Sequence, residues 1–416
     1  MKRIIRNLGI VLSITAMVLV SCKDKNLNSE LEEEEQPTDT VDQTYIRKVR
    51  DIIIYQDARF YSAFPSVVKG KNGEFLVAFR RAPDRRIFGE PGSNHVDPNS
   101  YLVMVRSTDG ENWTREPELM YAHPFGGSQD PCLLKLRDGT LICSSYSWAF
   151  VLPSGVPNLR EPYHMADGRA YFLGGYVIRS RDNGKTWEGP DYPPHISSEV
   201  HYSALGNPLP AYNRGAMYEE EDGRILWVVA ANDKKTPRKI SAHLLTSEDK
   251  GVTWQYACPV ATDDTYSFSE ASLHKTPKGD IVAFLRTTDM DDMACIARST
   301  DGGKSFQPWE KMDFRGHPLH ALRLSDNRVL LTYGYRHKPY GIRTRILNPE
   351  CTDFKTAPEI ILRADGGSTD IGYPWSVQLD ENKALVVYYF NVGEGIRRIA
   401  GTILEITHER IVSIKN

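Results

Sequence analysis

Four short segments of the chain repeat one pattern, Ser-x-Asp-x-Gly-x-Thr-Trp, and this repeat constrains the fold more than any other feature. The copies cover residues 107–113, 180–187, 247–254 and 299–306, and the first copy is one residue short. Ser and Asp side chains can accept hydrogen bonds from amides of their own turn, and glycine supplies a positive φ. The aromatic residue can then bury its ring between neighbouring sheets. Because apolar strands precede the copies, they predict a fold of repeated β-hairpins.

A second recurring element lies between these copies, and it consists of a strand, a turn and another strand. It occurs at residues 64–79, 132–144, 217–229, 272–285, 319–332 and 377–388. Apolar residues alternate within these segments, and no segment keeps a helical period. The pattern predicts an all-β fold, a six-bladed β-propeller with four-stranded antiparallel blades over residues 46–416. We expect residues 47–55 to close the ring beside residues 397–406.

The first 45 residues are predicted to lie outside this domain. Residues 1–22 combine a basic start with a short apolar run, which is the layout of a secretory signal peptide. The run ends in Leu-Val-Ser-Cys, which resembles the lipobox of bacterial lipoproteins and implies lipidation of Cys22; the alternative is an ordinary signal peptide that happens to contain a cysteine. Residues 23–45 are polar and acidic and are predicted to form a disordered tether. We therefore expect an exported lipoprotein held to a membrane only by its lipid, in the periplasm, at the outer membrane or on the cell surface.

Charge and cysteine content exclude several classes of function. A net charge of -3 without a basic cluster argues against nucleic acid as a partner. Five cysteines remain after Cys22, an odd and scattered set that forms no disulfide framework. Cys132 and Cys143 flank one turn and could pair, or they could be small buried core residues. Metal-ligand spacing and phosphate-binding glycine loops are missing, so we expect no metal and no cofactor. We also expect a monomer.

The fourfold repeat resembles the Asp-box of the sialidase superfamily, and this resemblance extends over the whole domain from about residue 46. In that family the boxes are structural and lie away from the active site. The segment Asp-Ile-Gly-Tyr-Pro around Tyr373 is similar to the one that carries the family's tyrosine nucleophile. Glu270 followed by Arg286 matches its glutamate–arginine arrangement. The resemblance implies that Glu270 activates Tyr373, that Arg286 and Arg343 bind the substrate carboxylate, and that Asp97 is the acid/base.

Several of these assignments have competitors in the sequence. Asp84 competes with Asp97, because an insertion makes the register between them ambiguous. Arg336 and Arg345 compete with Arg343, since only one of the three needs to point inward. Further polar residues lie at or before strands that a propeller brings to its centre and are candidates for substrate binding; they are His95, Asp130, His317 and His320.

One position departs from the family pattern. Sialidases carry an arginine before the first inner strand, where this chain has Ala63. Arg80 or Arg81, at the end of the next strand, could replace it. The sequence therefore predicts an exo-glycosidase that removes a terminal acidic sugar from a glycan. The alternatives are an enzyme of the same fold acting on a neutral or uronic sugar, and a glycan-binding propeller without catalysis.

Overall fold

The structure, a computed structural model, describes residues 42–413 except 91–94, 167–168, 236 and 394. The predicted signal peptide, the lipidation site Cys22 and most of the predicted tether lie outside the described residues. The first strand begins at Asp42, slightly before the predicted start of the propeller at residue 46. No helix in the part of the chain that the structure describes is long and apolar enough to cross a membrane.

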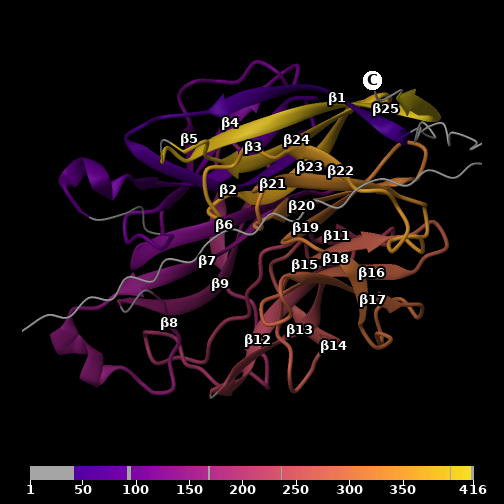
Figure 1. The fold of residues 1–416 in the computed structure, drawn as a ribbon. Helices are drawn as coiled ribbons and strands as arrows, with labels where there is room; N and C mark the ends of the chain where they lie inside the picture. Colours follow the sequence, from indigo (N-terminus) through magenta and orange to yellow (C-terminus); the bar gives the residue numbers. More distant parts are fainter. Residues whose placement is uncertain (1–41, 91–94, 167–168, 236, 394, 414–416) are drawn as a thin grey trace, which may run out of the picture. The chain divides into compact units, whose positions relative to one another are not determined.

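The described residues form 25 strands and two short 3-10 helices, η1 (Arg85–Phe88) and η2 (Pro153–Asn158). The strands make six antiparallel sheets, so the predicted six-bladed propeller is confirmed (Figure 1). Blade 1 contains β2 (Phe60–Lys69), β3 (Phe75–Pro83), β4 (Tyr101–Ser107) and β5 (Glu118–Tyr121). Blade 2 contains β6 (Gly126–Lys135), β7 (Leu141–Phe150), β9 (Ala170–Ser180) and β10 (Glu188–Asp191), with the short β8 (Met165–Ala166) beside β9. Blade 3 contains β11 (Tyr218–Glu219), β12 (Ile225–Lys235), β13 (Arg238–Ser247) and β14 (Gln255–Ala261).

Blades 4 to 6 complete the ring. Blade 4 contains β15 (Phe268–Lys275), β16 (Ile281–Thr287), β17 (Met293–Ser299) and β18 (Glu310–Arg315). Blade 5 contains β19 (Leu319–Arg323), β20 (Val329–Tyr335), β21 (Gly341–Leu347) and β22 (Ile360–Arg363). Blade 6 contains β23 (Gly372–Asp380), β24 (Lys383–Phe390), β25 (Arg398–Ser413) and β1 (Asp42–Tyr55).

The first strand of the chain closes the ring, as predicted. β1 joins blade 6 next to β25, so this blade combines the beginning and the end of the propeller. Thr402 donates its hydroxyl to Asp51 at 2.6 Å, and Arg47 forms an ion pair with Glu405. Segments far apart in the sequence therefore share one sheet.

The four Asp-boxes are stapled turns between the third and fourth strands of blades 1 to 4. In the second box, Asp182 accepts hydrogen bonds from the amides of Lys185 and Thr186 at 3.0 and 2.9 Å. The amide of Gly184 donates to the hydroxyl of Ser180 at 2.8 Å. These contacts confirm the predicted structural role of the repeat.

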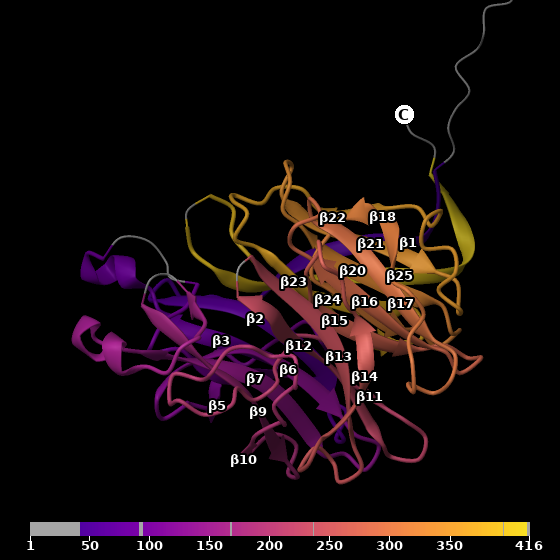
Figure 2. The same cartoon turned by 90° about the horizontal axis from the view of Figure 1, so that it is seen from below.

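The core lies between the blades, because each sheet is apolar on both faces. Separate clusters of buried residues join each pair of neighbouring blades, including blades 6 and 1. The five cysteines Cys132, Cys143, Cys258, Cys295 and Cys351 are buried and free, so the core interpretation of Cys132 and Cys143 is confirmed. The first strands of the blades contact one another around the centre (Figures 1 and 2). This arrangement brings distant parts of the sequence to one axis.

Strand direction gives the two ends of the axis different contents. The first strand of each blade ends in a short turn at one end of the axis. The third strand runs in the same direction as the first, so the Asp-box turn that follows it lies at that same end. The opposite end receives the connections between second and third strands and between consecutive blades. Three of these connections are long, at residues 84–100, 151–169 and 192–217. Long loops beside a rigid scaffold are where binding sites concentrate.

Candidate active site

The innermost strands of four blades contain the same irregularity, a register shift near the loop-rich end. A non-glycine residue with positive φ lies at each shift: Phe64 (59°), Asp130 (33°), Glu270 (42°) and Tyr373 (53°). A positive φ is unusual for residues with a side chain and marks a functional or strained site. The bulge turns these four side chains toward the axis at one level.

Tyr373, Glu270 and Arg286 form a hydrogen-bonded cluster at this level. The phenol of Tyr373 donates to Glu270 Oε1 at 2.6 Å. Arg286 Nη1 donates to Tyr373 Oη at 3.0 Å and also forms an ion pair with Glu270 Oε2. Blades 4 and 6 therefore bring together a phenol, a carboxylate and a guanidinium that are far apart in sequence. These are the residues predicted as nucleophile, base and carboxylate-binding arginine.

The protonation states of the cluster follow from its burial and its charges. Burial, together with the charge of Glu270, raises the pKa of the Tyr373 phenol above its ordinary value, so the phenol is neutral. Burial opposes ionisation of Glu270, but Arg286 and the phenol hydrogen bond outweigh it, and the pKa of this carboxyl is lowered. Burial opposes the charge of Arg286, but Glu270 and Tyr373 raise its pKa. A neutral phenol thus faces an ionised base.

Arg214 completes the axis and was missing from the sequence-based candidates. Its guanidinium lies 4.8 Å from the ring of Tyr373 and donates to the carbonyl of Pro65 at 2.8 Å. It also donates to the carbonyl of Tyr373 at 3.2 Å. A signal for it exists in the sequence, because Arg-Gly-Ala at residues 214–216 aligns with Asp-Pro-Cys at 130–132 and Glu-Ala-Ser at 270–272.

Asp130 is a buried carboxyl close to the cluster. Its Oδ2 accepts a hydrogen bond from the hydroxyl of Tyr146 at 2.8 Å. Its Oδ1 is buried and has no hydrogen-bond partner within the described chain. Burial raises the pKa of Asp130, and nearby Arg214 only partly opposes this effect. Asp130 therefore favours the protonated state.

The two carboxylates that competed for the acid/base role are both held by arginines. Asp97 accepts from Arg85 through both oxygens, at 2.7 and 2.9 Å. Asp84 forms an ion pair with Arg86, and these contacts lower the pKa of Asp84. The structure brings neither into contact with Tyr373, so the role of Asp97 stays a prediction.

Arg336, rather than Arg343 or Arg345, lies at the cluster. Its guanidinium is 5.2 Å from the ring of Tyr373 and donates to the carbonyl of Ile371 at 3.1 Å. Arg343 is on β21, one strand farther from the axis, and it donates to the carbonyls of Pro339 and Arg363. The structure therefore corrects the prediction that Arg343 belongs to the cluster around Tyr373. Arg343 lies on the third strand of its blade, which is too far from the axis to reach the cluster.

Arg80 and Arg81 point to opposite faces of β3. Arg80 stands directly across from Ala63 in the strand pairing, is completely buried and lies over the rings of Tyr61 and Phe64. No guanidinium nitrogen of Arg80 has a hydrogen-bond partner among the residues described. Arg81 instead stacks on Phe60 at 3.5 Å. Arg80 therefore lies on the strand next to Ala63, the position where the sialidase pattern has an arginine.

Of the remaining candidates, His95 and His317 lie at the same end of the axis as Tyr373, whereas His320 lies farther along it. His95 contacts the ring of Phe64 edge-on and lies 3.9 Å from Asp370. Asp370 also accepts from Tyr61 and from Arg397. Burial raises the pKa of this carboxyl, but His95 and then Arg397 outweigh burial and keep it low. His317 is buried near Arg286 and Arg336, and burial with these charges lowers its pKa. His320 lies deeper in the axis, stacked on Trp375.

A cavity of about 220 Å³ opens beside the cluster. Glu270 and Arg286 from blade 4, Arg214 from blade 3 and aromatic residues of blade 2 line it. Tyr373 is not part of the lining but reaches Glu270 through its hydrogen bond. The cavity therefore gives a small polar molecule access to the carboxylate and the guanidinium. No group of three metal-ligating side chains occurs among the residues that the structure describes.

Comparisons with known proteins agree with this architecture. The family model for the BNR repeat-like domain matches residues 164–386. A Dyadobacter fermentans protein of unknown function has 67% identity and a TM-score of 0.86, over 87% of this chain and 99% of that one. Streptococcus pneumoniae NanB sialidase has 13% identity and a TM-score of 0.61, over 85% and 70%. Penicillium chrysogenum α-L-arabinanase has 13% identity and a TM-score of 0.59, over 87% and 99%. No curated protein sequence matches the chain.

Proposed function

Because the chain belongs to the BNR repeat-like domain family and has the six-bladed fold of sialidases and arabinanases, we propose that it is a glycoside hydrolase removing a terminal acidic sugar. The observation that carries this proposal is the contact of the neutral Tyr373 phenol with the ionised Glu270 and with Arg286. A binding protein has no need for a nucleophile and its base in direct contact.

The cluster suits a sugar with a carboxylate at its anomeric carbon. Such a substrate repels an anionic nucleophile, whereas a neutral phenol can approach it. Most glycosidases use two carboxylates, and sialidases use a tyrosine instead. Glu270 takes the phenolic proton while Tyr373 Oη bonds to the anomeric carbon and the leaving oxygen departs with a proton from an acid. Water then releases the sugar from Tyr373, and the acid and Glu270 regain their starting states.

Asp130 is the proton donor that the geometry favours over Asp97. A general acid must hold a proton at the working pH, and burial shifts the pKa of Asp130 upward, in the direction that favours the protonated form. Asp97 accepts hydrogen bonds from Arg85 through both of its oxygens, so a guanidinium already occupies this carboxyl group. Tyr146 connects Asp130 to the wall of the cavity.

Three guanidinium groups support an acidic substrate. Arg286 lines the cavity, Arg336 lies against Tyr373, and Arg80 is buried beside Phe64 without a hydrogen-bond partner in the described residues. Arginine forks bind carboxylates through paired hydrogen bonds.

A neutral furanoside is the second candidate substrate, and one observation favours it. Ala63 stands at the position where sialidases carry an arginine, so the first inner strand offers no charge to a substrate carboxylate. A solved structure with the same fold is an α-L-arabinanase. An uncharged sugar would need only Glu270, Asp130 and the aromatic wall of the cavity.

Fluorogenic glycosides separate these possibilities. We expect release of the fluorophore from a sialoside or another acidic glycoside, and a loss of kcat/KM on the order of 10³-fold or more in Tyr373→Phe. Tyr192→Phe, which removes an exposed hydroxyl of blade 2, is the matched control and should keep full activity. Turnover of an arabinofuranoside alone supports the second candidate. Binding of glycans without turnover of any substrate would contradict both.

We also propose that the mature protein is anchored through a lipid on Cys22. The support is the sequence pattern, an apolar run followed by Ser-Cys and an acidic segment. Cells expressing the chain should hold it in the membrane fraction, and Cys22→Ala should release it or leave the signal uncleaved. Equal membrane association of Cys22→Ala would contradict the anchor.

A further inference from the structure

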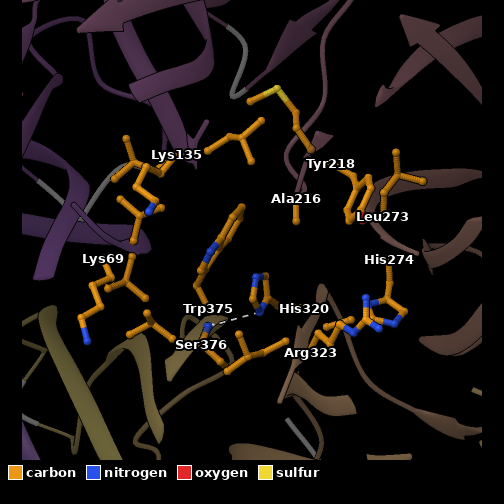
Figure 3. A pocket seen from close by; sticks show the side chains of 18 residues that line it. Lys69, Lys135, Ala216, Tyr218, Leu273, His274, His320, Arg323, Trp375 and Ser376 are labelled. Atoms are coloured by element: carbon orange, nitrogen blue, oxygen red, sulfur yellow. Dashed lines mark hydrogen bonds between the residues drawn. The ribbon is translucent and has the colours of Figure 1, made fainter. Parts of the chain in front are cut away.

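A second pocket lies on the propeller axis at the end opposite the candidate active site. It has a volume of about 330 Å³, which is within the range of small-molecule sites. All six blades contribute to it, through β2, β6, β15, β19, β23 and the residues entering β11. Figure 3 shows Trp375 and His320 in its middle, with Lys69 and Lys135 on one side and His274 and Arg323 on the other.

Arg214 separates this pocket from the candidate active site. Its guanidinium lies 4.8 Å from the ring of Tyr373 and 5.6 Å from the ring of Trp375, which are two residues apart on β23. Arg214 belongs to the lining of the cavity beside Glu270 and not to that of the axial pocket. The two sites are therefore distinct, and the axial pocket takes no part in the proposed hydrolysis.

The inner part of the pocket is apolar. Val67, Leu133, Leu273 and Val377 face it from four different blades, and the Trp375 ring covers its floor. His320 stacks on Trp375 with ring centres 4.5 Å apart, and its Nδ1 accepts from the amide of Ser376. A flat, fixed aromatic surface of this kind binds the body of an organic molecule.

Three cationic side chains stand at the rim of the pocket. They are Lys69, Lys135 and Arg323, the last residues of β2, β6 and β19, and all three are exposed. Each follows an apolar lining residue by two positions, so it lies on the same face of its strand. No carboxylate lines the pocket, and none of the three cations forms an ion pair within the described residues. Clustered like charges raise the local concentration of a ligand of opposite sign.

A buried histidine forms part of the pocket wall. His274 lines the pocket and is 4% exposed, and its Nε2 has no hydrogen-bond partner in the described part of the chain. A buried polar group without a partner costs free energy, so native structures rarely keep one without a reason.

We infer that the axial pocket binds a small organic anion with an apolar body, which lies on Trp375 while its charged group meets Lys69, Lys135 and Arg323. The apolar walls exclude a bare inorganic ion, and the cationic rim discriminates against a neutral molecule of the same shape. The ligand belongs to the class of aromatic or aliphatic carboxylates and sulfonates.

Anilinonaphthalene sulfonate is a suitable probe, because it combines an apolar body with one negative charge and becomes fluorescent when bound. We expect saturable binding of one probe per chain. Phenylnaphthylamine, which has the same body without the sulfonate, should bind about tenfold more weakly or worse. The double variant Lys69→Glu/Lys135→Glu should weaken binding of the sulfonate by a similar factor and leave binding of the neutral probe unchanged.

The matched control changes the same charge at the same end of the propeller outside the pocket. Lys278→Glu/Lys304→Glu reverses two exposed lysines in turns of blade 4 and should keep the affinity of the parent protein. Equal loss of affinity in both double variants, equal binding of the two probes, or binding of several sulfonates per chain would each overturn the inference. Thermal unfolding of every variant verifies that the fold is intact.

Discussion

At the scale of single residues, the proposed chemistry depends on opposite pKa shifts of two carboxyls. The pKa of Glu270 is lowered by Arg286 and by the hydrogen bond from Tyr373, whereas burial raises the pKa of Asp130. Two titratable groups whose environments separate their pKa values are the usual assignment of a base and an acid. The phenol of Tyr373 donates to Glu270, and Asp130 is close enough to raise the pKa of that phenol.

These shifts predict a bell-shaped dependence of kcat/KM on pH. Activity needs ionised Glu270, so the acid limb falls as pH drops through a pKa below the ordinary value for glutamate. Activity also needs protonated Asp130, so the alkaline limb falls as pH rises through a pKa above the ordinary aspartate value of about 3.9. Asp130→Asn should remove the alkaline limb and lower kcat by about 10²–10⁴-fold. Loss of that limb in Asp97→Asn instead would assign the acid to Asp97.

Replacing Arg80 is expected to increase the stability of the fold and to weaken the binding of an acidic substrate. Its guanidinium is buried without a hydrogen-bond partner among the described residues, and burial lowers its pKa. Replacing a buried, poorly compensated charge by an apolar side chain is often stabilising. Arg80→Met should therefore raise the free energy of unfolding by about 1–3 kcal/mol and raise KM for an acidic glycoside. Arg81→Met, on the other face of β3, is the control and should change neither the free energy of unfolding nor KM. An unchanged KM in Arg80→Met would exclude Arg80 from the substrate site.

At the scale of strands and turns, the sequence predicts the fold well because its strongest signals are local. Each Asp-box is complete within about eight residues, and its Ser, Asp and Gly bond within their own turn. Each hairpin is likewise defined by its own alternation and turn. Four boxes and six hairpins therefore determine the number of blades without any long-range information.

The site is harder to predict, because it depends on which strand of a blade carries a side chain. Glu270 and Tyr373 lie on innermost strands, and Arg286 lies at the end of a second strand, so strand order places all three correctly. Arg343 is on a third strand and remains outside. The bulges add another difficulty, since a shift of one residue reverses the face of each following side chain. Arg85 beside Asp97 follows from loop packing, which no periodicity reveals.

The Asp-box predicts a stability effect that leaves catalysis unchanged. Asp182→Ala removes the acceptor for two backbone amides and for the Thr186 hydroxyl, all near the surface. Backbone amides that lose their hydrogen-bond acceptor but remain accessible to water lower the free energy of unfolding by only about 1 kcal/mol, at the low end of the range for unsatisfied polar groups. Thermal unfolding should show this loss, while kcat/KM stays unchanged because the turn is at the far end of the blade. Glu221→Ala, in an exposed hairpin turn of blade 3, is the control; a large fall of kcat in Asp182→Ala would contradict a purely structural role.

At the scale of the whole molecule, the two ends of the propeller axis carry different proposed sites. The loop-rich end collects the bulged residues of the innermost strands, and the turn-rich end holds the axial pocket with its cationic rim. Arg214 contacts the carbonyls of Phe64 and Tyr373 and thereby ties three blades together between the two ends. A single buried side chain thus separates the proposed hydrolytic site from the proposed anion site.

Closure of the ring by β1 predicts how the molecule tolerates shortening. Ile46, Ile54 and Tyr55 of this strand are buried against blades 5, 6 and 1, and each such side chain stabilises the fold by about 1.5–3 kcal/mol. Their sum is comparable to the whole stability of a typical domain, about 5–15 kcal/mol. A chain that starts at residue 42 should therefore unfold at the temperature of the longer protein, whereas one that starts at residue 57 should unfold at a much lower temperature or not fold. Because β1 joins β25 at the outer edge of blade 6, Ile54→Ala should show an intermediate loss of about 2–5 kcal/mol. Equal unfolding temperatures for the two shortened chains would mean that three strands suffice for blade 6.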